Sequence, residues 1–359
     1  MISGGGTGGH IYPAISIAQA LQDMVQDVEI LFVGAQGKME MKKVPEAGFQ
    51  IVGLWISGIQ RSLSAQNLMF PFKVISSLFK AFGLIRSFKP HAVIGVGGYA
   101  SGPLLYAASA KKVPTLIQEQ NSYAGLTNKW LAGRVNRICV AHDGMEKYFP
   151  ADKLVVTGNP VRKTILPKPD LKPSAYEFFG FDSSKKTILI VGGSLGARSI
   201  NEFILTGYDR LAASGYQVIW QTGGYYFEEM KRRVTNPSAN ILLKDFVREM
   251  QYAYAVADVV ISRAGALSIA ELMLTGKPSI LVPSPNVAED HQTINAMALV
   301  ERDAAVLVKD NEAAEKLIDT AFSLIEDEDR KRVLSENIKG MSHPNSAKDI
   351  ANEILKMIA

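Results

Sequence analysis

Residues 1–21 read MISGGGTGGHIYPAISIAQAL: a short apolar start, a glycine cluster, a histidine and a segment with the composition of a helix. Glycine stands at positions 4, 5, 6, 8 and 9, directly before His10. A single tight turn needs one or two glycines for its backbone angles, not five. The order predicts a strand, a loop and a helix, with loop N–H groups able to reach an anion at the helix N-terminus.

Apolar runs with strand character alternate with amphipathic, helix-like segments along the chain. They are VEILFVG (28–34), AVIGVGG (92–98), PTLIQEQ (114–120), RICVA (137–141), TILIVGG (187–193), QVIWQTG (217–223), DVVISRAG (258–265) and PSILVPS (278–284). This alternation predicts an α/β fold built from βαβ units with parallel sheets. Four prolines in 157–173 predict a connection between domains. We expect one domain over residues 1–159, joined by a helix at 346–359, and a second over 160–345.

The composition is typical of a globular chain, since 47% of the 359 residues are hydrophobic and 21% are charged. Residues 1–159 hold 15 Lys and Arg against 9 Asp and Glu, whereas residues 160–359 hold 24 against 26. The basic first half indicates an anionic surface or ligand. No run of ~18 apolar residues, as a membrane-spanning helix needs, is present. The single cysteine, Cys139, excludes an internal disulfide.

Metal ligands and nucleic-acid partners are not expected. The one D-x-D, Asp327 to Asp329, lies in EDEDRKR and is typical of a solvated helix start. The five histidines lack metal-ligand spacing.

The first glycine loop satisfies G-x-G-x-x-G at Gly4, Gly6 and Gly9. A dinucleotide site also needs an acidic residue at the end of the second strand, which here ends in Gly34 and Ala35. A nicotinamide cofactor is therefore disfavoured. At a helix start the neutral form of His10 is favoured, which suits a general base or a donor to a phosphate. A capping or packing ring is the alternative.

Three further loops follow the same pattern. GVGGYASGPLLYAA (95–108) predicts a second anion site, and polar residues Glu119 to Asn121 end the next strand. VGGSLGARSIN (191–201) predicts a diphosphate site at Ser194, or alternatively the nucleophile elbow of a serine hydrolase with Asp258 and His291 or His343. In RAGALSIAE the carboxylate of Glu271 could accept both hydroxyls of a ribose; the alternative is a surface helix glutamate that the helix dipole favours.

Seven motifs follow one another along the chain: GGGTGGH, GGYASGP, EQNSYAGLTNKWLA, TGNPVR, VGGSLGARSIN, RAGALSIAE and EDHQTINA. Taken in this order, they closely resemble the MurG family of bacterial N-acetylglucosaminyltransferases, in glycosyltransferase family 28. The match runs from Gly4 to about Asn295. The resemblance implies a GT-B fold, in which two Rossmann-like domains with parallel sheets face each other across a cleft, and no cofactor. It assigns the acceptor and the membrane to residues 1–159, and UDP-N-acetylglucosamine (UDP-GlcNAc) to 160–345.

The resemblance also implies the site residues. Val247 would contact uracil through its backbone, Glu271 would bind the ribose diol, and Gln292 or its neighbour His291 would contact the sugar hydroxyls. The full donor set is Thr7, Gly8, Gly9, Asn121, Arg162, Ser194, Val247, Ala266, Leu267, Ser268, Glu271 and Gln292. The expected acceptor-diphosphate set is Gly97, Gly98, Tyr99 and Ser101.

The implied reaction is transfer of GlcNAc to the 4-hydroxyl of N-acetylmuramic acid (MurNAc) in lipid I, giving lipid II with inversion. His10, or else Glu119, would be the catalytic base. Amides at Ser194 and the Arg162 guanidinium would stabilise the leaving diphosphate. The alternatives are a UDP-GlcNAc 2-epimerase on the same fold and the serine hydrolase.

The segment LMFPFKVISSLFKAFGLIRSFK (68–89) mixes large apolar residues with lysine and arginine. This composition is typical of an amphipathic helix on an anionic membrane, although a helix that buries its apolar face in its own domain is the alternative. Membrane contact is predicted for Ile75, Phe79, Phe82 and Lys80. We therefore expect a peripheral protein on the cytoplasmic face of the inner membrane, with anionic phospholipid and a cell-wall synthesis complex as partners.

Overall fold

The computed structural model describes residues 1–58, 68–166, 168, 170–193, 195–287 and 290–359. The chain divides into two compact units: Met1–Arg162 with Asn345–Ala359, and Lys163–Pro344. The sequence predicts the boundaries between the two domains after residues 159 and 345.

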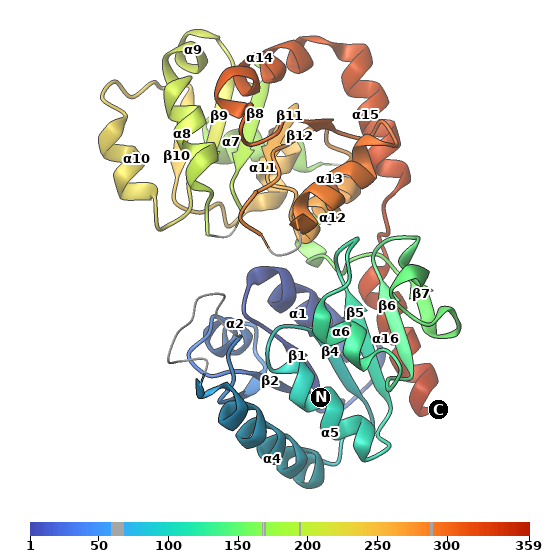
Figure 1. Ribbon diagram of the computed structural model, residues 1–359. Coiled ribbons are helices and arrows are strands. Elements are labelled where there is room, and N and C mark those ends of the chain that lie inside the picture. The colour runs from blue at the N-terminus through green and yellow to red at the C-terminus, as the bar shows by residue number, and fades with distance from the viewer. Residues whose placement is uncertain (59–67, 167, 169, 194, 288–289) are drawn as a thin grey trace. The chain divides into compact units, whose positions relative to one another are not determined.

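The first unit is built on a seven-stranded parallel sheet in the order β3-β2-β1-β4-β5-β6-β7 (Figure 1). Its strands are β1 (Ile2–Gly4), β2 (Leu31–Ala35), β3 (Gln50–Leu54), β4 (Val93–Gly97), β5 (Thr115–Glu119), β6 (Arg137–Val140) and β7 (Leu154–Val156). Neighbouring strand residues such as Phe32 and Val33 enter different hydrophobic clusters, because successive side chains point to opposite faces of a sheet. Both faces are therefore buried.

Helices cover the two faces of this sheet. One face packs against α4 (Phe70–Phe88), α5 (Ser101–Ala110) and α6 (Leu126–Leu131). The other packs against α1 (Gly8–Met24), α2 (Glu40–Glu46) and α16 (Ser346–Ile358). The last helix, α16, comes from the far end of the chain and packs against α1 (Figure 1). Short 3-10 turns lie at Met145–Lys147 and Ala151–Lys153.

The second unit has a six-stranded parallel sheet in the order β10-β9-β8-β11-β12-β13. Its strands are β8 (Thr187–Val191), β9 (Gln217–Gln221), β10 (Ile241–Lys244), β11 (Val259–Ser262), β12 (Ser279–Leu281) and β13 (Val306–Leu307). Its helices are α7 (Leu171–Phe179), α8 (Arg198–Thr206), α9 (Tyr208–Ala213), α10 (Phe227–Arg233), α11 (Met250–Val256), α12 (Ala266–Thr275), α13 (His291–Val300), α14 (Ala313–Glu326) and α15 (Glu328–Gly340), after a 3-10 turn at Lys163–Ile165.

Each sheet has one point where the strand order reverses. In the first unit the chain leaves β1 toward β2 and β3 and later returns beside β1 as β4. In the second, β8 and β11 are the corresponding neighbours. Open parallel sheets bind ligands at the carboxyl ends of the strands at such a point. All four glycine-containing loops singled out in the sequence follow one of these four strands.

The acidic run 326–329 forms an exposed helix start, as expected. Asp327 caps α15 by accepting a hydrogen bond from the Arg330 N–H at 2.8 Å. Within the described ranges, no cluster of three or more His, Cys, Asp or Glu side chains is placed to hold a metal ion. No helix in the described part of the chain is both long and apolar enough to span a bilayer.

Candidate active site

The two glycine loops of the first unit pack directly on each other. The Gly5 N–H donates to the Gly97 carbonyl at 3.3 Å. Gly98 has φ +90°, and a Cβ there would lie 2.5 Å from the Gly5 carbonyl oxygen. Gly97 has φ +105°, and a Cβ there would lie 2.6 Å from Cδ2 of His10. Two of the four residues predicted as diphosphate ligands, Gly97 and Gly98, therefore have to be glycine because of close packing as well.

His10 lies in the first turn of α1, and its ring is half-buried beside Gly97. Its Nδ1 is 3.0 Å from the Gly5 carbonyl oxygen. Because a carbonyl can only accept, this contact assigns the proton of the neutral ring to Nδ1 and makes Nε2 the acceptor nitrogen. A backbone carbonyl thus orients the ring in the tautomer that a general base needs.

The residues before His10 form the helix start. Thr7 is the N-cap residue and is exposed, Gly8 is buried and Gly9 is half-buried. The helix begins without a side-chain cap. The first-turn N–H groups and the helix dipole therefore favour an anionic ligand here.

Glu119, the second candidate base, is 2% exposed and surrounded by donors. Its Oε1 accepts from the Asn121 backbone N–H at 3.1 Å and from the Asn121 side chain at 3.3 Å. Its Oε2 accepts from the Gly125 N–H at 3.0 Å and from the Asn128 side chain at 2.8 Å. Four donors already occupy its two oxygens, so the geometry favours a role in shaping the segment that carries Asn121 over proton acceptance.

The residues predicted as ligands in the second glycine loop differ in their exposure to solvent. Tyr99 is 48% exposed. Ser101 is fully buried, and its hydroxyl donates to the Ser3 carbonyl at 3.4 Å. Contrary to the prediction of a diphosphate contact, the Ser101 side chain ties α5 to β1. Arg162, at the end of the unit, lies over the Tyr12 ring of α1 with 5.3 Å between the guanidinium carbon and the ring centroid.

In the second unit a cavity of about 570 Å³ lies at the carboxyl ends of β8, β11 and β12. It is lined by Gly192, Gly196, Ala197, Arg198, Ser199, Glu202, Phe203, Tyr226, Arg263, Ser284, Asn286, Gln292 and Asp310. Gly196 has φ +80°, and a Cβ there would lie 2.0 Å from the Thr222 carbonyl oxygen. Close approach of the loops after β8 and β9 therefore requires glycine at this position. Ser194 lies outside the described residues.

Gln292 is the predicted sugar contact that lines this cavity. Its Oε1 accepts from the Ser284 N–H at 2.9 Å, so the side chain is held by the loop after β12. His291 is the first residue of α13 and is not a lining residue. The geometry favours Gln292 over His291 for the sugar.

Glu271 lies on α12 and is 5% exposed. Its Oε2 accepts from the Tyr254 hydroxyl at 3.0 Å. Ala266, Leu267 and Ser268 form the half-buried first turn of the same helix. A buried carboxylate held by a tyrosine is not the surface helix glutamate that was the alternative.

Val247 is 3% exposed, and its backbone N–H donates to Oε1 of Gln221 at 2.9 Å. The predicted uracil contact through this N–H therefore has to displace Gln221, or use the Val247 carbonyl instead.

Arg263 has a role that the motif alone did not reveal. It is buried, and its Nη1 donates to the Val282 carbonyl at 2.9 Å, the Pro283 carbonyl at 3.1 Å and Oδ1 of Asp310 at 2.6 Å. Its Nη2 donates to the Ser199 hydroxyl. One guanidinium thus ties together the segments that follow β11, β12 and β13 with the start of α8, around the cavity.

The hydrolase alternative needs an acid near Ser194. Asp258 instead accepts from the Thr187 N–H at 2.7 Å, and Thr187 is the first residue of β8. Residues 192–196 follow the opposite end of that strand, so Asp258 lies at the wrong edge of the sheet to complete a triad.

The predicted membrane segment forms α4 and divides into two sides. Ile75 is 52% exposed and Phe79 is 75% exposed, and Phe72, at helical spacing from both, is 63% exposed. Phe82 instead packs on the hydrophobic cluster beneath the helix, so its predicted membrane contact is not supported. The Lys80 ammonium donates to the Gly53 carbonyl at 2.8 Å, which holds α4 to β3.

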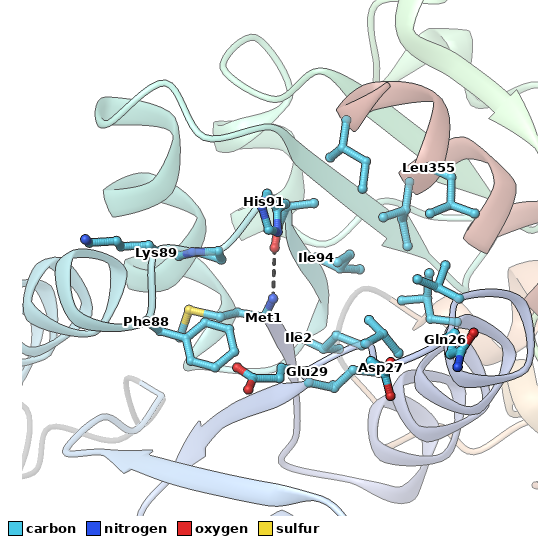
Figure 2. A pocket seen from close by; sticks show the side chains of 18 residues that line it. Met1, Ile2, Gln26, Asp27, Glu29, Phe88, Lys89, His91, Ile94 and Leu355 are labelled. Atoms are coloured by element: carbon cyan, nitrogen blue, oxygen red, sulfur yellow. Dashed lines mark hydrogen bonds between the residues drawn. The ribbon is translucent and has the colours of Figure 1, made fainter.

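Another cavity, of about 430 Å³, lies in the first unit at the amino ends of β1 and β4 (Figure 2). Met1, Phe88 and Leu355 line it, and the Met1 amino group donates to the Ala92 carbonyl at 2.8 Å. No predicted site residue lines it. It lies at the edge of the sheet opposite the glycine loops.

Two family models match the chain. The glycosyltransferase family 28 N-terminal domain matches residues 1–140, and the C-terminal domain of that family matches residues 187–354. The chain belongs to glycosyltransferase family 28. As a member of family 28 it is a glycosyltransferase, and the resemblance seen in the sequence is confirmed.

Family 28 relatives cover the whole chain. A protein of Cytophaga hutchinsonii is 55% identical over 358 residues, 100% of this chain and 96% of the relative. A protein of Parabacteroides distasonis is 54% identical over 359 residues, 100% and 98%. Both are named UDP-N-acetylglucosamine--N-acetylmuramyl-(pentapeptide) pyrophosphoryl-undecaprenol N-acetylglucosamine transferase. The crystal structure of Acinetobacter baumannii MurG has a TM-score of 0.78 at 28% identity and 99% coverage of each chain. The predicted α/β, GT-B class is thereby confirmed.

Proposed function

We propose that this enzyme transfers GlcNAc from UDP-GlcNAc to the 4-hydroxyl of MurNAc in undecaprenyl-diphospho-MurNAc-pentapeptide, lipid I, to give lipid II for peptidoglycan synthesis. The observation that carries the proposal is similarity at 55% identity, over the full chain, to a transferase named for this reaction. The epimerase alternative is not favoured, because relatives at 50–55% identity are named as transferases.

The first unit supplies the base. Nε2 of His10 accepts the proton of the attacking 4-hydroxyl, while the Gly5 carbonyl holds Nδ1–H and stabilises the imidazolium that forms. The new C1–O4 bond forms as the bond from C1 to the UDP oxygen breaks. A single displacement of this kind inverts the anomeric configuration.

The second unit supplies the donor site. Glu271 binds the ribose diol, Gln292 binds the sugar, and the loop before α8 receives the diphosphate. The N-terminus of α8 and Arg198, a lining residue at its start, place positive charge where the leaving group becomes more negative. Five of the expected donor contacts belong to the first unit: Thr7, Gly8, Gly9, Asn121 and Arg162.

The deciding experiment is transfer of labelled GlcNAc from UDP-GlcNAc to a lipid I analogue. We expect the acceptor to gain one GlcNAc, with equimolar release of UDP. Formation of UDP-N-acetylmannosamine without any transfer would establish the epimerase instead, and labelling of Ser194 by a fluorophosphonate probe with no transfer would establish the hydrolase.

Glu271→Ala is expected to raise the KM for UDP-GlcNAc by roughly ten- to a hundredfold, because the charged acceptor of two ribose hydroxyls is lost. Tyr254→Phe is the matched control, since it removes only the hydroxyl that donates to the Glu271 carboxylate. Steady-state kinetics with varied UDP-GlcNAc measure both variants. If the KM of the alanine variant is unchanged, Glu271 does not bind the ribose.

We also propose that α4 holds the enzyme on an anionic membrane, on the cytoplasmic face where UDP-GlcNAc is available. Phe72, Ile75 and Phe79 provide the apolar side of this contact, and the basic excess of residues 1–159 provides the electrostatic attraction.

The double variant Ile75→Ser/Phe79→Ser is expected to weaken association with anionic liposomes at least about tenfold, since each buried side chain of this size contributes roughly 1.5–3 kcal/mol. Sedimentation with phosphatidylglycerol-containing vesicles measures the association. Tyr225→Ser, at an 85% exposed aromatic of the second unit, is the control and should bind as the unchanged protein does. Equal binding of the α4 variant would refute the assignment.

A further inference from the structure

Glu40 is a buried carboxylate that the proposed reaction does not use. It is the first residue of α2 and is 1% exposed. Its Oε2 accepts from the Gly6 N–H at 2.8 Å, and its Oε1 accepts from the Ala35 N–H at 3.0 Å. Burying a carboxylate is costly unless it is hydrogen-bonded, and here each oxygen has a backbone donor.

The glycines around Glu40 make room for its carboxylate. A Cβ on Gly5 would lie 2.2 Å from Oε1 of Glu40, and a Cβ on Gly34 would lie 2.6 Å from its Cγ. The Gly6 N–H belongs to the G-x-G-x-x-G loop, where dinucleotide-binding folds receive a phosphate. In this chain a side chain of the protein itself supplies the anion at that N–H.

The same loop connects Glu40 to His10 through a single peptide group. The Gly6 N–H that donates to Glu40 and the Gly5 carbonyl that accepts from His10 Nδ1 are the two polar atoms of the Gly5–Gly6 peptide bond. Hydrogen bonds in such a chain polarise one another, so a carboxylate on the N–H strengthens the carbonyl as an acceptor. The order carboxylate, peptide, imidazole resembles a carboxylate–histidine dyad with one peptide group inserted.

We propose that Glu40 is a positioning residue for His10, acting through the Gly5–Gly6 peptide group. It fixes the ring in the Nδ1–H tautomer and stabilises the imidazolium formed when Nε2 accepts the acceptor's proton. The inference rests on the proposed function, in which His10 is the base. Glu40 itself touches no substrate.

Glu40→Gln tests this with little change in shape. A glutamine has one acceptor oxygen, so its NH₂ group must face either the Gly6 or the Ala35 N–H, donor against donor. We expect kcat for GlcNAc transfer to fall roughly ten- to a hundredfold, as for a slightly misplaced catalytic group, with the KM for UDP-GlcNAc within about twofold. Glu46→Gln is the matched control, because it makes the same change at an exposed position of the same helix.

A ¹⁵N spectrum of the histidine side chains provides a readout that a purely structural role would not move. The chain has five histidines, and His10→Ala identifies the signal of His10. We expect the Nδ1–H tautomer in the unchanged protein and in Glu46→Gln, and a shift toward Nε2–H in Glu40→Gln. Unchanged kcat in Glu40→Gln, or lost kcat with an unchanged His10 tautomer, would overturn the proposal.

Two further measurements keep the inference testable if Glu40→Gln folds poorly. In the unchanged protein, a predominant Nε2–H tautomer of His10 would by itself overturn it. In Glu40→Ala, acetate but not acetamide should restore part of the lost turnover, because only the anion replaces the carboxylate. Absence of GlcNAc transfer by the unchanged protein would reject the proposed function, while the tautomer measurement would still decide the link from Glu40 to His10.

Discussion

His10→Ala is expected to lower kcat for GlcNAc transfer by roughly 10²–10⁴-fold, the usual contribution of a positioned general base. The Gly5 carbonyl already orients the ring, so the loss removes a preorganised base and not merely a contact. Since the role proposed for the ring is at the acceptor hydroxyl, the KM for UDP-GlcNAc should change little. Steady-state transfer to a lipid I analogue measures both constants.

The matched control is His343→Ala, at an exposed histidine of the second unit, which should keep full turnover. If His10→Ala retains nearly full turnover, His10 is not the base. The base would then have to come from another acceptor-side loop. Glu119, in the 119–128 segment, is not a good substitute, because its carboxylate already accepts from four donors.

Arg263→Met is expected to destabilise the second unit by about 3 kcal/mol, because it leaves Asp310 without its cation and three other groups without this donor. The Asp310 side chain is 19% exposed, so we place the loss at the low end of the range for buried pairs. Hydrogen exchange of the β11 and β12 amides measures the effect within this unit.

The double variant Arg263→Met/Asp310→Asn should recover part of the loss, since no buried charge then remains unpaired. Arg210→Met is the comparison, because it breaks a pair with Asp319 whose side chains are 54% and 65% exposed, and should cost less than about 1 kcal/mol. Equal losses in the Arg263 and Arg210 variants would show that burial of the Arg263 network contributes nothing.

The strands that the sequence predicted are the ones with continuous apolar runs. Each of the eight runs overlaps a strand, from β2 for 28–34 to β12 for 278–284. The strands not singled out are β3, β7, β10 and β13, which have two to five residues each. Apolar periodicity is a weak signal over so few residues.

Burial of individual helix residues was less predictable. Phe79 and Phe82 have the same composition around them, yet one is exposed and the other packs on the core. The rotation of α4 on its sheet decides between them. Ser101, expected at the acceptor diphosphate, and Lys80, expected at the membrane, each donate to a carbonyl group of a neighbouring strand, which the sequence did not predict.

The α/β class, the parallel sheets, the glycine loops at their carboxyl ends and the family could all be predicted without coordinates, because they depend on local periodicity and on ordered motifs. Only the tertiary structure revealed Glu40 and Arg263. The Glu40 carboxylate, on α2, binds a loop 34 residues away, and Arg263 binds Asp310 across 47 residues. Such contacts depend on how strands and helices are placed side by side, and no local pattern of residues encodes that placement.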